Sequence, residues 1–118
     1  MIEREELFDY IEDKYKVKPD HPWDTFENYA ALRHKDNEKW FALVMDITPD
    51  KIGLKGDKKI DVLNLKVRNE FIGMLRKTEG IYQAYHMDKD NWVTINLREM
   101  DSMGDIEDLI EESFDLTK

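Results

Sequence analysis

The sequence predicts an α+β fold in which a five-stranded, mainly antiparallel sheet carries helices on one face. Apolar residues recur at helical spacing near both ends of the chain and in one short central segment. Segments of alternating or continuous apolar residues lie between them, and several are joined by short turn-forming stretches. Because hairpin and meander connections join antiparallel neighbours, we expect a two-layer α/β sandwich of order α-β(3)-α-β(2)-α.

The first helix is expected from about Ile2 to Tyr15. Its apolar residues fall on one helical stripe and acidic residues take the other positions, so this helix should lie on the sheet. The stripe consists of Leu7, Phe8, Ile11 and Tyr15. Pro19 and Pro22 prevent the helix from continuing, because proline lacks the backbone N–H that a helix interior needs.

A pair of strands is expected next, over Phe26 to Arg33 and Lys39 to Ile47, joined by a turn at residues 35–37. In the second strand both faces are mostly apolar. One face should carry Phe41, Leu43, Met45 and Ile47, and the other Trp40, Ala42 and Val44. This pattern is typical of a central strand that helices cover on one side, while residues such as Trp40 or a partner cover the other.

Residues 48–59 are expected to form a lysine-bearing loop with a short extended piece at Ile52 to Lys55, followed by a third strand at Ile60 to Lys66. A short helix should then run from Asn69 to Arg76. We expect Asn69 to be its N-cap, Gly80 to stop it, and three of its apolar side chains to face inward. Those side chains are Phe71, Met74 and Leu75.

Residues 81–97 carry a strong β-hairpin signal, with strands at Ile81 to His86 and Asn91 to Leu97. If Asp88 and Lys89 are the central turn residues, Tyr85 lies opposite Trp92 and Ala84 opposite Val93. Tyr82, Ala84, Val93 and Ile95 would then share one face, and Gln83, Tyr85, Trp92 and Thr94 the other.

The last helix should begin near Ser102, because Ser102 and Asp105 resemble a capping box. Its inward positions, at core spacing, are Ile106, Leu109, Ile110 and Phe114.

The composition indicates one domain spanning residues 1–118, since 41% hydrophobic residues in 118 are enough to build a core. The chain has no cysteine, which excludes disulfides, thiol nucleophiles and thiolate metal sites, and makes the cytoplasm the expected location. Neither a signal peptide nor a membrane span is expected, and the predicted state is a monomer.

Charge is distributed unevenly along this chain of net charge −9. The segment from Glu99 to Lys118 is strongly acidic and would repel a polyanion. The only basic stretch runs from Asp50 to Arg68. Because nucleic-acid binding depends on cations that neutralise phosphates, any such activity would have to use this stretch.

Signatures of catalysis are absent from the sequence. It contains no phosphate-binding loop, no dinucleotide-binding glycine motif and no nucleophile elbow. His21, His34 and His86 lie far apart without the spacing of metal ligands. We therefore expect a protein that is not an enzyme and that uses no metal or cofactor.

Several aromatic residues and one histidine leave two interpretations open. His86, beside Lys89 at the hairpin tip, is either a rim histidine bonded to a turn carbonyl or part of a ligand-contacting tip. Trp40 and Trp92 are core residues, half-buried cover of the sheet, or stacking platforms for bases, and aromatic side chains more often serve as core or cover.

Six colinear segments resemble the MmcQ/YjbR family. They are Pro22-Trp23-Asp24, Ala30 to His34, Lys39 to Met45, Leu63 to Val67, Ala84 to Trp92, and Ser113 to Leu116. The resemblance implies the α-β(3)-α-β(2)-α fold, with a CyaY-like, secretion-chaperone-like architecture. It also implies the family's label as DNA-binding proteins through a double-wing arrangement, with no enzymatic activity. The hairpin tip is more acidic here than in the family pattern, which has Asn at the position of Asp88.

Two functions therefore remain as hypotheses. The first is a non-enzymatic DNA-binding module, and the alternative is a protein-binding adaptor or chaperone-like module that uses an exposed face of the sheet. The residues expected to contact a nucleic acid or another partner are Lys55, Lys58, Lys59, Lys66, Arg68, Tyr85, His86, Lys89 and Trp92.

Overall fold

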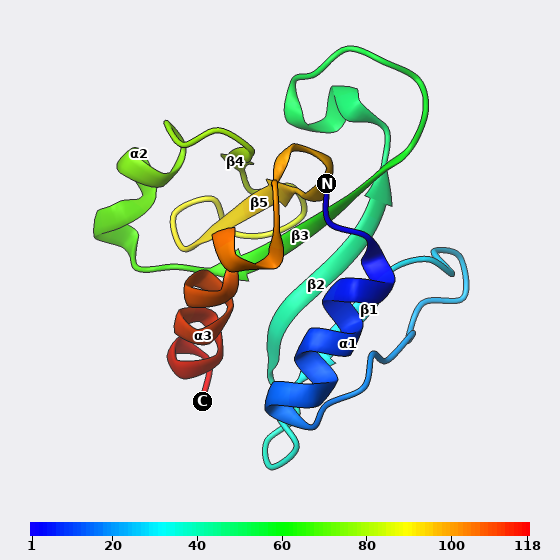
Figure 1. Cartoon of the computed structure of the whole chain (residues 1–118), viewed down its shortest axis with the longest axis vertical. Coiled ribbons are helices and arrows are strands. Elements are labelled where there is room, and N and C mark those ends of the chain that lie inside the picture. The colour runs from blue at the N-terminus through cyan, green and yellow to red at the C-terminus, as the bar shows by residue number, and fades with distance from the viewer.

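Five antiparallel strands form one sheet in the order β1-β2-β3-β5-β4 in the computed structural model, which describes residues 1–118 (Figure 1). The strands are β1 (Ala30–Arg33), β2 (Trp40–Ile47), β3 (Ile60–Lys66), β4 (Ile81–Gln83) and β5 (Trp92–Asn96). The helices are α1 (Arg4–Tyr15), α2 (Ile72–Leu75) and α3 (Glu107–Leu116). This arrangement confirms the predicted fold class and element order. None of the helices has the length and apolarity that crossing a bilayer requires.

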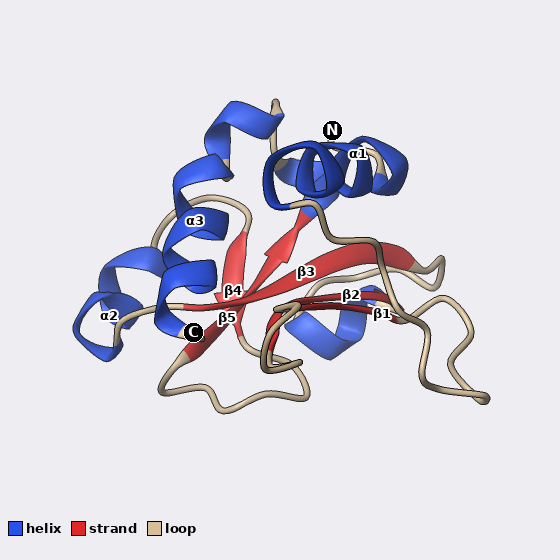
Figure 2. Cartoon of the chain, turned by 90° about the horizontal axis from the view of Figure 1, so that it is seen from below, coloured by secondary structure: helices blue, strands red, loops and turns tan.

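Helices α1 and α3 lie on the same side of the sheet and cover its main core (Figure 2). Leu7 and Ile11 of α1 are fully buried, as the helical spacing predicted. They join a cluster of 20 buried residues that includes Ile106 and Ile110 at the other helix and Leu63 of β3. Removing this apolar surface from water is the largest favourable contribution to the fold.

The opposite side of the sheet, which we call the open face, has a second and smaller core without α1 or α3. Its buried residues are Tyr29, Leu43, Met45, Ile47, Ile60 and Val62. Loop residues pack against them, from the segment before β1 and from the loop between β4 and β5 (Figure 2). β2 is therefore covered on both sides, by helices on one and mainly by loops on the other.

β1 is shorter than expected, because residues 26–29 form a turn and are not part of a strand. The backbone N–H of Tyr29 donates to the carbonyl of Phe26 over 3.0 Å. The strand register also shifts between Leu32 and Arg33. As a result, Phe41 packs in the helix-side core with Ala42, while Trp40 lies with the open-face cluster, which reverses the faces predicted for these two aromatic residues.

Two further local predictions were wrong. The expected extended piece at Ile52 to Lys55 is absent, because Pro49 opens a 3-10 turn over Pro49–Ile52 that ends at Gly53 with φ 83°. The central helix begins with a 3-10 turn whose N-cap is Arg68, since the side chain of Asn69 donates to the carbonyl of Asp90.

The central helix also faces differently from the prediction, and its α-helical part ends at Leu75, before Gly80. Phe71 and Met74 are 39% and 62% exposed, while Ile72 and Leu75 pack on the core. The 3-10 start changes the rotation per residue and therefore the side that meets the core.

The hairpin between β4 and β5 has a register one residue away from the predicted one. Gln83 lies opposite Val93 and Tyr82 opposite Thr94, and residues 84–91 form a long loop. A shift of one residue exchanges the two faces, so Ile81 rather than Tyr82 joins Ile95 in the main core. The two-residue turn does not form, because the carbonyl of Asp88 accepts the backbone N–H groups of Asn91 and Trp92.

The C-terminal helix is fastened to the sheet by two buried polar side chains. The hydroxyl of Ser113 donates to the carbonyl of Phe41 over 2.6 Å and accepts the backbone N–H of Lys66 over 2.9 Å. Nε2 of His34 lies 2.7 Å from the hydroxyl of Thr117, which itself donates to the carbonyl of Ser113. The N-terminal end follows the capping prediction in part, since the Asp105 carboxylate accepts the N–H of Ser102 before a 3-10 turn leads into α3.

Burial lowers the pKa of His34, while Asp36 raises it and Lys118 lowers it by smaller amounts. The folded state favours neutral His34. The contribution of His34 to stability is therefore complete above its ordinary pKa of 6.5 and is lost as the pH falls toward its lower pKa in the folded state.

We expect the free energy of unfolding of His34→Phe to fall less than that of the wild type between about pH 7.5 and about pH 5. Urea unfolding of both proteins across this pH range checks this expectation. His21→Gln, at an exposed histidine, is the control, and parallel curves for His34→Phe and the wild type would contradict the account.

Candidate functional site

The open face of the sheet contains an apolar hollow of about 290 Å³, which we call the aromatic hollow. Seven of its eight lining residues are hydrophobic, and His86 is the exception. They are Trp23, Phe26, Tyr29, Trp40, Leu43, Met45, His86 and Met87. Small-molecule and side-chain sites are typically concave, mostly apolar and equipped with few polar groups, as this hollow is.

The aromatic walls of the hollow meet at steep angles. Trp23 packs edge-on against Trp40 with ring centroids 5.3 Å apart and an interplanar angle of 69°, and against Tyr29 at 6.0 Å and 73°. Phe26 stacks on Tyr29 at 4.7 Å and 19°. Edge-to-face and stacked pairs are favourable aromatic geometries, so the walls support one another.

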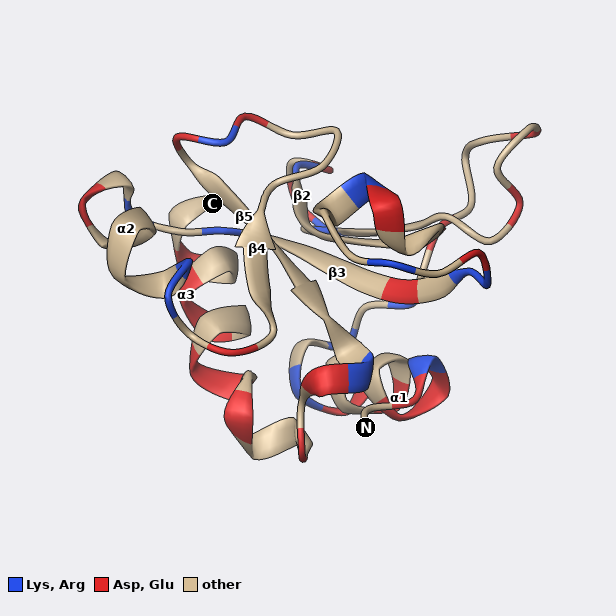
Figure 3. Cartoon of the chain, turned by 90° about the horizontal axis from the view of Figure 1, so that it is seen from above, with Lys and Arg blue, Asp and Glu red and all other residues tan.

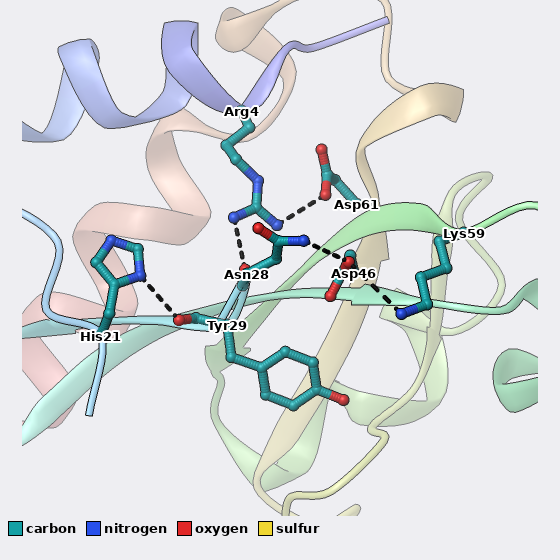
Figure 4. A network of polar contacts seen from close by, with 7 residues as sticks. All are labelled: Arg4, His21, Asn28, Tyr29, Asp46, Lys59 and Asp61. Carbon is teal, nitrogen blue, oxygen red and sulfur yellow. Dashed lines mark hydrogen bonds and ion pairs between the residues drawn. The ribbon is translucent and has the colours of Figure 1, made fainter. Parts of the chain in front are cut away.

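A polar network holds the segment that supplies three of these rings (Figure 4). Arg4 of α1 donates to the carbonyl of Asn28 and, over 2.8 Å, to the carboxylate of Asp61 on β3. The side chain of Asn28 donates to Asp46 over 3.1 Å, and Lys59 lies 3.9 Å from the same carboxylate. The network connects the segment before β1 to a helix and to two strands, so that Phe26 and Tyr29 are placed by contacts distant in sequence.

The beginning of that segment is attached to the edge strand. Asp20 and Ala31 exchange two backbone hydrogen bonds of 2.9 and 2.8 Å, which form an isolated bridge. The carboxylate of Asp20 also pairs with Arg33 at 3.0 Å, and the Arg33 guanidinium lies 5.8 Å from the ring centroid of Trp40. These contacts cover the edge of β1 and place Trp23 over Trp40.

The other wall is positioned by two buried polar residues beneath the β4–β5 loop. Thr94 donates to the side chain of Asn64 and accepts the backbone N–H of Tyr85 over 2.9 Å. Asn64 in turn donates to the carbonyl of Tyr85 over 2.8 Å. Asn64 and Thr94 are fully buried neighbours on β3 and β5, so the sheet holds both backbone groups of Tyr85.

His86 follows in a left-handed conformation with φ 69°, which is unfavourable for a residue with a side chain. Its ring packs on Tyr85 with centroids 3.9 Å apart. This backbone turn ends the extended segment and brings His86 and Met87 to the hollow. At the tip, hydrogen bonds from Asn91 and Asp90 lower the pKa of the Asp88 carboxyl.

A second, more polar hollow of about 670 Å³ adjoins the first and shares Phe26, Tyr29 and His86 with it. Charged side chains of both signs line it. They are Asp24, Glu27, Asp46, Lys51 and Lys59. The two hollows together form a continuous surface across the open face, apolar at one end and charged at the other.

The basic residues predicted to contact a partner do not gather at this surface. Lys55, Lys58 and Lys59 precede β3 and Lys66 ends it, so these two groups are about 20 Å apart at about 3.3 Å per residue. Figure 3 shows basic segments at both ends of β3, interspersed with acidic ones. Lys59 is paired with Asp46, and Lys66 lies close enough to Asp88 to influence its pKa.

The remaining predicted residues separate into two places. Tyr85 and His86 border the hollows, whereas Lys66, Arg68, Lys89 and Trp92 do not line them. Sequence reasoning missed Trp23, Phe26 and Tyr29 as a group. The density of aromatic residues in residues 23–29, next to a strand with two apolar faces, was the available signal.

The fold and the hollows define a small α+β protein with a five-stranded antiparallel sheet, helices on one face and an aromatic hollow on the other. The chain belongs to the YjbR family, whose model matches residues 12–116.

Known relatives agree with this assignment. The uncharacterized protein YyaQ of Bacillus subtilis strain 168 is 48% identical over 118 residues, which cover 100% of both chains. The crystal structure of a Pseudomonas syringae protein has a TM-score of 0.96 at 51% identity and covers 99% of this chain and 100% of that one. Deinococcus radiodurans protein DR2400, with a TM-score of 0.69 at 23% identity, covers 95% of this chain and 75% of its own, and shares the fold.

Asn64→Leu removes the partner of two buried groups, the Thr94 hydroxyl and the Tyr85 carbonyl. We expect it to lower the free energy of unfolding by about 1–3 kcal/mol, the usual cost of unsatisfied buried polar groups. Urea unfolding measures the loss.

The matched comparison for Asn64→Leu is Thr94→Val, alone and combined with it. Because the two side chains bond to each other, the double variant should cost less than the sum of the single ones. Additive losses would show that the pair does not act as one unit.

Proposed function

We propose that this protein is a non-enzymatic adaptor that binds a segment of a partner protein on the open face of its sheet. The segment inserts an extended side chain into the aromatic hollow and lies across the adjoining polar hollow. The observation that carries this proposal is the concentration of four aromatic rings and two methionines around a concave surface. Aromatic residues and methionine are enriched where proteins recognise one another.

Keeping these apolar side chains exposed to water is unfavourable in free energy, and this supports the proposal that a partner covers them. Phe26 is 47% exposed, while its neighbours Trp23 and Trp40 are only partly covered. Polar contacts from α1, β2 and β3 hold the segment around Phe26 in place, so the surface is preformed. A preformed apolar surface loses less conformational entropy on binding.

Electrostatics favour a protein partner over a nucleic acid. The net charge is −9, and the basic residues stand at separate ends of β3. A polyanion needs several cations within reach of adjacent phosphates, because released counterions supply much of the affinity. A polypeptide partner has no such requirement.

Phe26→Ser should remove protein partners that the wild type retains after nuclease treatment, since a side chain central to an interface commonly accounts for a tenfold or larger part of the affinity. Affinity purification followed by quantitative mass spectrometry, with binding of each candidate then measured using purified proteins, checks this.

Phe71→Ser is the matched control for Phe26→Ser, because Phe71 is also an exposed phenylalanine, at 39%, but lies beside α2 outside both hollows. Partners lost with Phe26→Ser and kept with Phe71→Ser support the adaptor. Direct partners that bind the Phe26→Ser variant as tightly as the wild type contradict it.

Nucleic-acid binding is the second candidate, and one observation favours it. Lys66 lies directly opposite Trp92 in the β3–β5 pairing, so that a cation and a half-buried aromatic ring stand side by side at one end of the sheet. Such a pair suits a phosphate and a stacked base. Two further cations belong to this end of the sheet: Arg68, which follows β3, and Lys89 in the β4–β5 loop.

If this second function operates, fluorescence anisotropy with random single-stranded and duplex DNA should show binding that weakens steeply with salt. Replacing Lys66, Arg68 and Lys89 by Ala should then weaken it, whereas replacing Lys55 and Lys58 at the other end should have a smaller effect. Absence of binding at low salt and tens of micromolar protein excludes this candidate.

A further inference from the structure

We propose that the aromatic hollow recognises a cation, the ammonium group of a lysine side chain in the partner segment, and binds it more tightly when it is methylated. The inference rests on the proposed adaptor function and specifies the chemistry of the group that enters the hollow. Three features of this surface support it: the orientation of the rings, the charge of the segment that supplies them, and a cation already placed on one of the rings.

The orientation of the rings suits a compact cation. Trp23 stands at 69° to Trp40 and at 73° to Tyr29, so that walls of different orientation meet around the hollow. A cation gains from the negative face of each ring within about 6 Å, and indole is the strongest of these partners.

The charge of the surrounding segment favours a positive ligand. The segment from Pro19 to Tyr29 contains Asp20, Asp24 and Glu27 and no Lys or Arg. Asp20 pairs with Arg33, whereas no ion pair involves Asp24 or Glu27. Both line the polar hollow that adjoins Phe26. Lys51 and Lys59 line the same hollow, and Lys59 is paired with Asp46.

The protein already places one of its own cations on a wall of the hollow. The Arg33 guanidinium lies 5.8 Å from the ring centroid of Trp40, with Asp20 at 3.0 Å as its counter-ion. A ring and an acidic residue of the 19–29 segment therefore hold a cation together. The same segment places Trp23 and Tyr29 on the aromatic hollow and the unpaired acids Asp24 and Glu27 on the polar hollow that adjoins it.

The experiment compares two probes of the same shape that differ in charge. One is the peptide acetyl-Gly-trimethyllysine-Gly-amide, and the other is its neutral isostere, in which the ammonium nitrogen is replaced by carbon. We expect the charged peptide to bind about three- to tenfold more tightly, the range of partly desolvated cation–π contacts. Unmodified lysine should lie between them, because its ammonium is more strongly hydrated.

Amide NMR titration of the full chain measures these affinities and locates the bound peptide. The largest shifts should occur at Trp23, Tyr29 and Trp40. Trp40→Leu should weaken the charged peptide several-fold and change the neutral one little, since leucine remains apolar but has no π face. Trp92→Leu is the control, because Trp92 is half-buried outside the hollow.

Asp24→Asn combined with Glu27→Gln tests the contribution of charge separately. It should weaken the trimethyllysine peptide, most clearly at low salt, and leave the isostere unchanged. Both residues are exposed, so the double variant should fold as the wild type does.

Equal or tighter binding of the neutral isostere overturns the inference and leaves the adaptor function in place, with an apolar side chain as the group that enters the hollow. Absence of binding by the charged peptide at millimolar concentration also overturns it. A different result contradicts the adaptor function: protein partners that bind the Phe26→Ser variant as tightly as the wild type. The two failures are therefore distinguishable.

Discussion

A central strand with two apolar faces is the constraint on which the rest of this structure depends. Val44 faces the helices while Leu43 and Met45 face the other way, and all three are buried. Each face must be removed from water, because exposed apolar surface of this size is unfavourable. Two helices cover one face fully. The other receives loop segments and the 3-10 turn at Pro49–Ile52, whose incomplete cover leaves the aromatic hollow.

Hydrogen-bonded polar side chains, most of them buried, turn this partial cover into a defined surface. Asn64 and Thr94 hold the backbone of Tyr85 from within the sheet, and Arg4 holds the carbonyl of Asn28 from α1. On the helical side, the hydroxyl of Ser113 likewise donates to the carbonyl of Phe41. Because such groups are costly when unpaired, each bond selects one position for its loop or helix and strengthens the specificity of the fold.

The same arrangement decides how function is distributed over the molecule. The apolar and aromatic surface lies on the open face over β2, whereas most of the basic residues predicted to contact a partner stand near the two ends of β3. Membership in the YjbR family does not choose between the two proposed functions, since the relative YyaQ is itself an uncharacterized protein. The proposed polypeptide partner rests on this separation of the aromatic surface from the basic residues.

The sequence by itself determined the element order, the buried stripe of α1 and the two apolar faces of β2, because periodicity reports which sides of an element must be covered. It did not determine the hairpin register, since the left-handed His86 and the bonds of Asn64 to Tyr85 come from tertiary contacts. The aromatic hollow also escaped prediction. Trp23 and Trp40 meet only because polar contacts fold the 20–29 segment back across the sheet, a contact that no local pattern encodes.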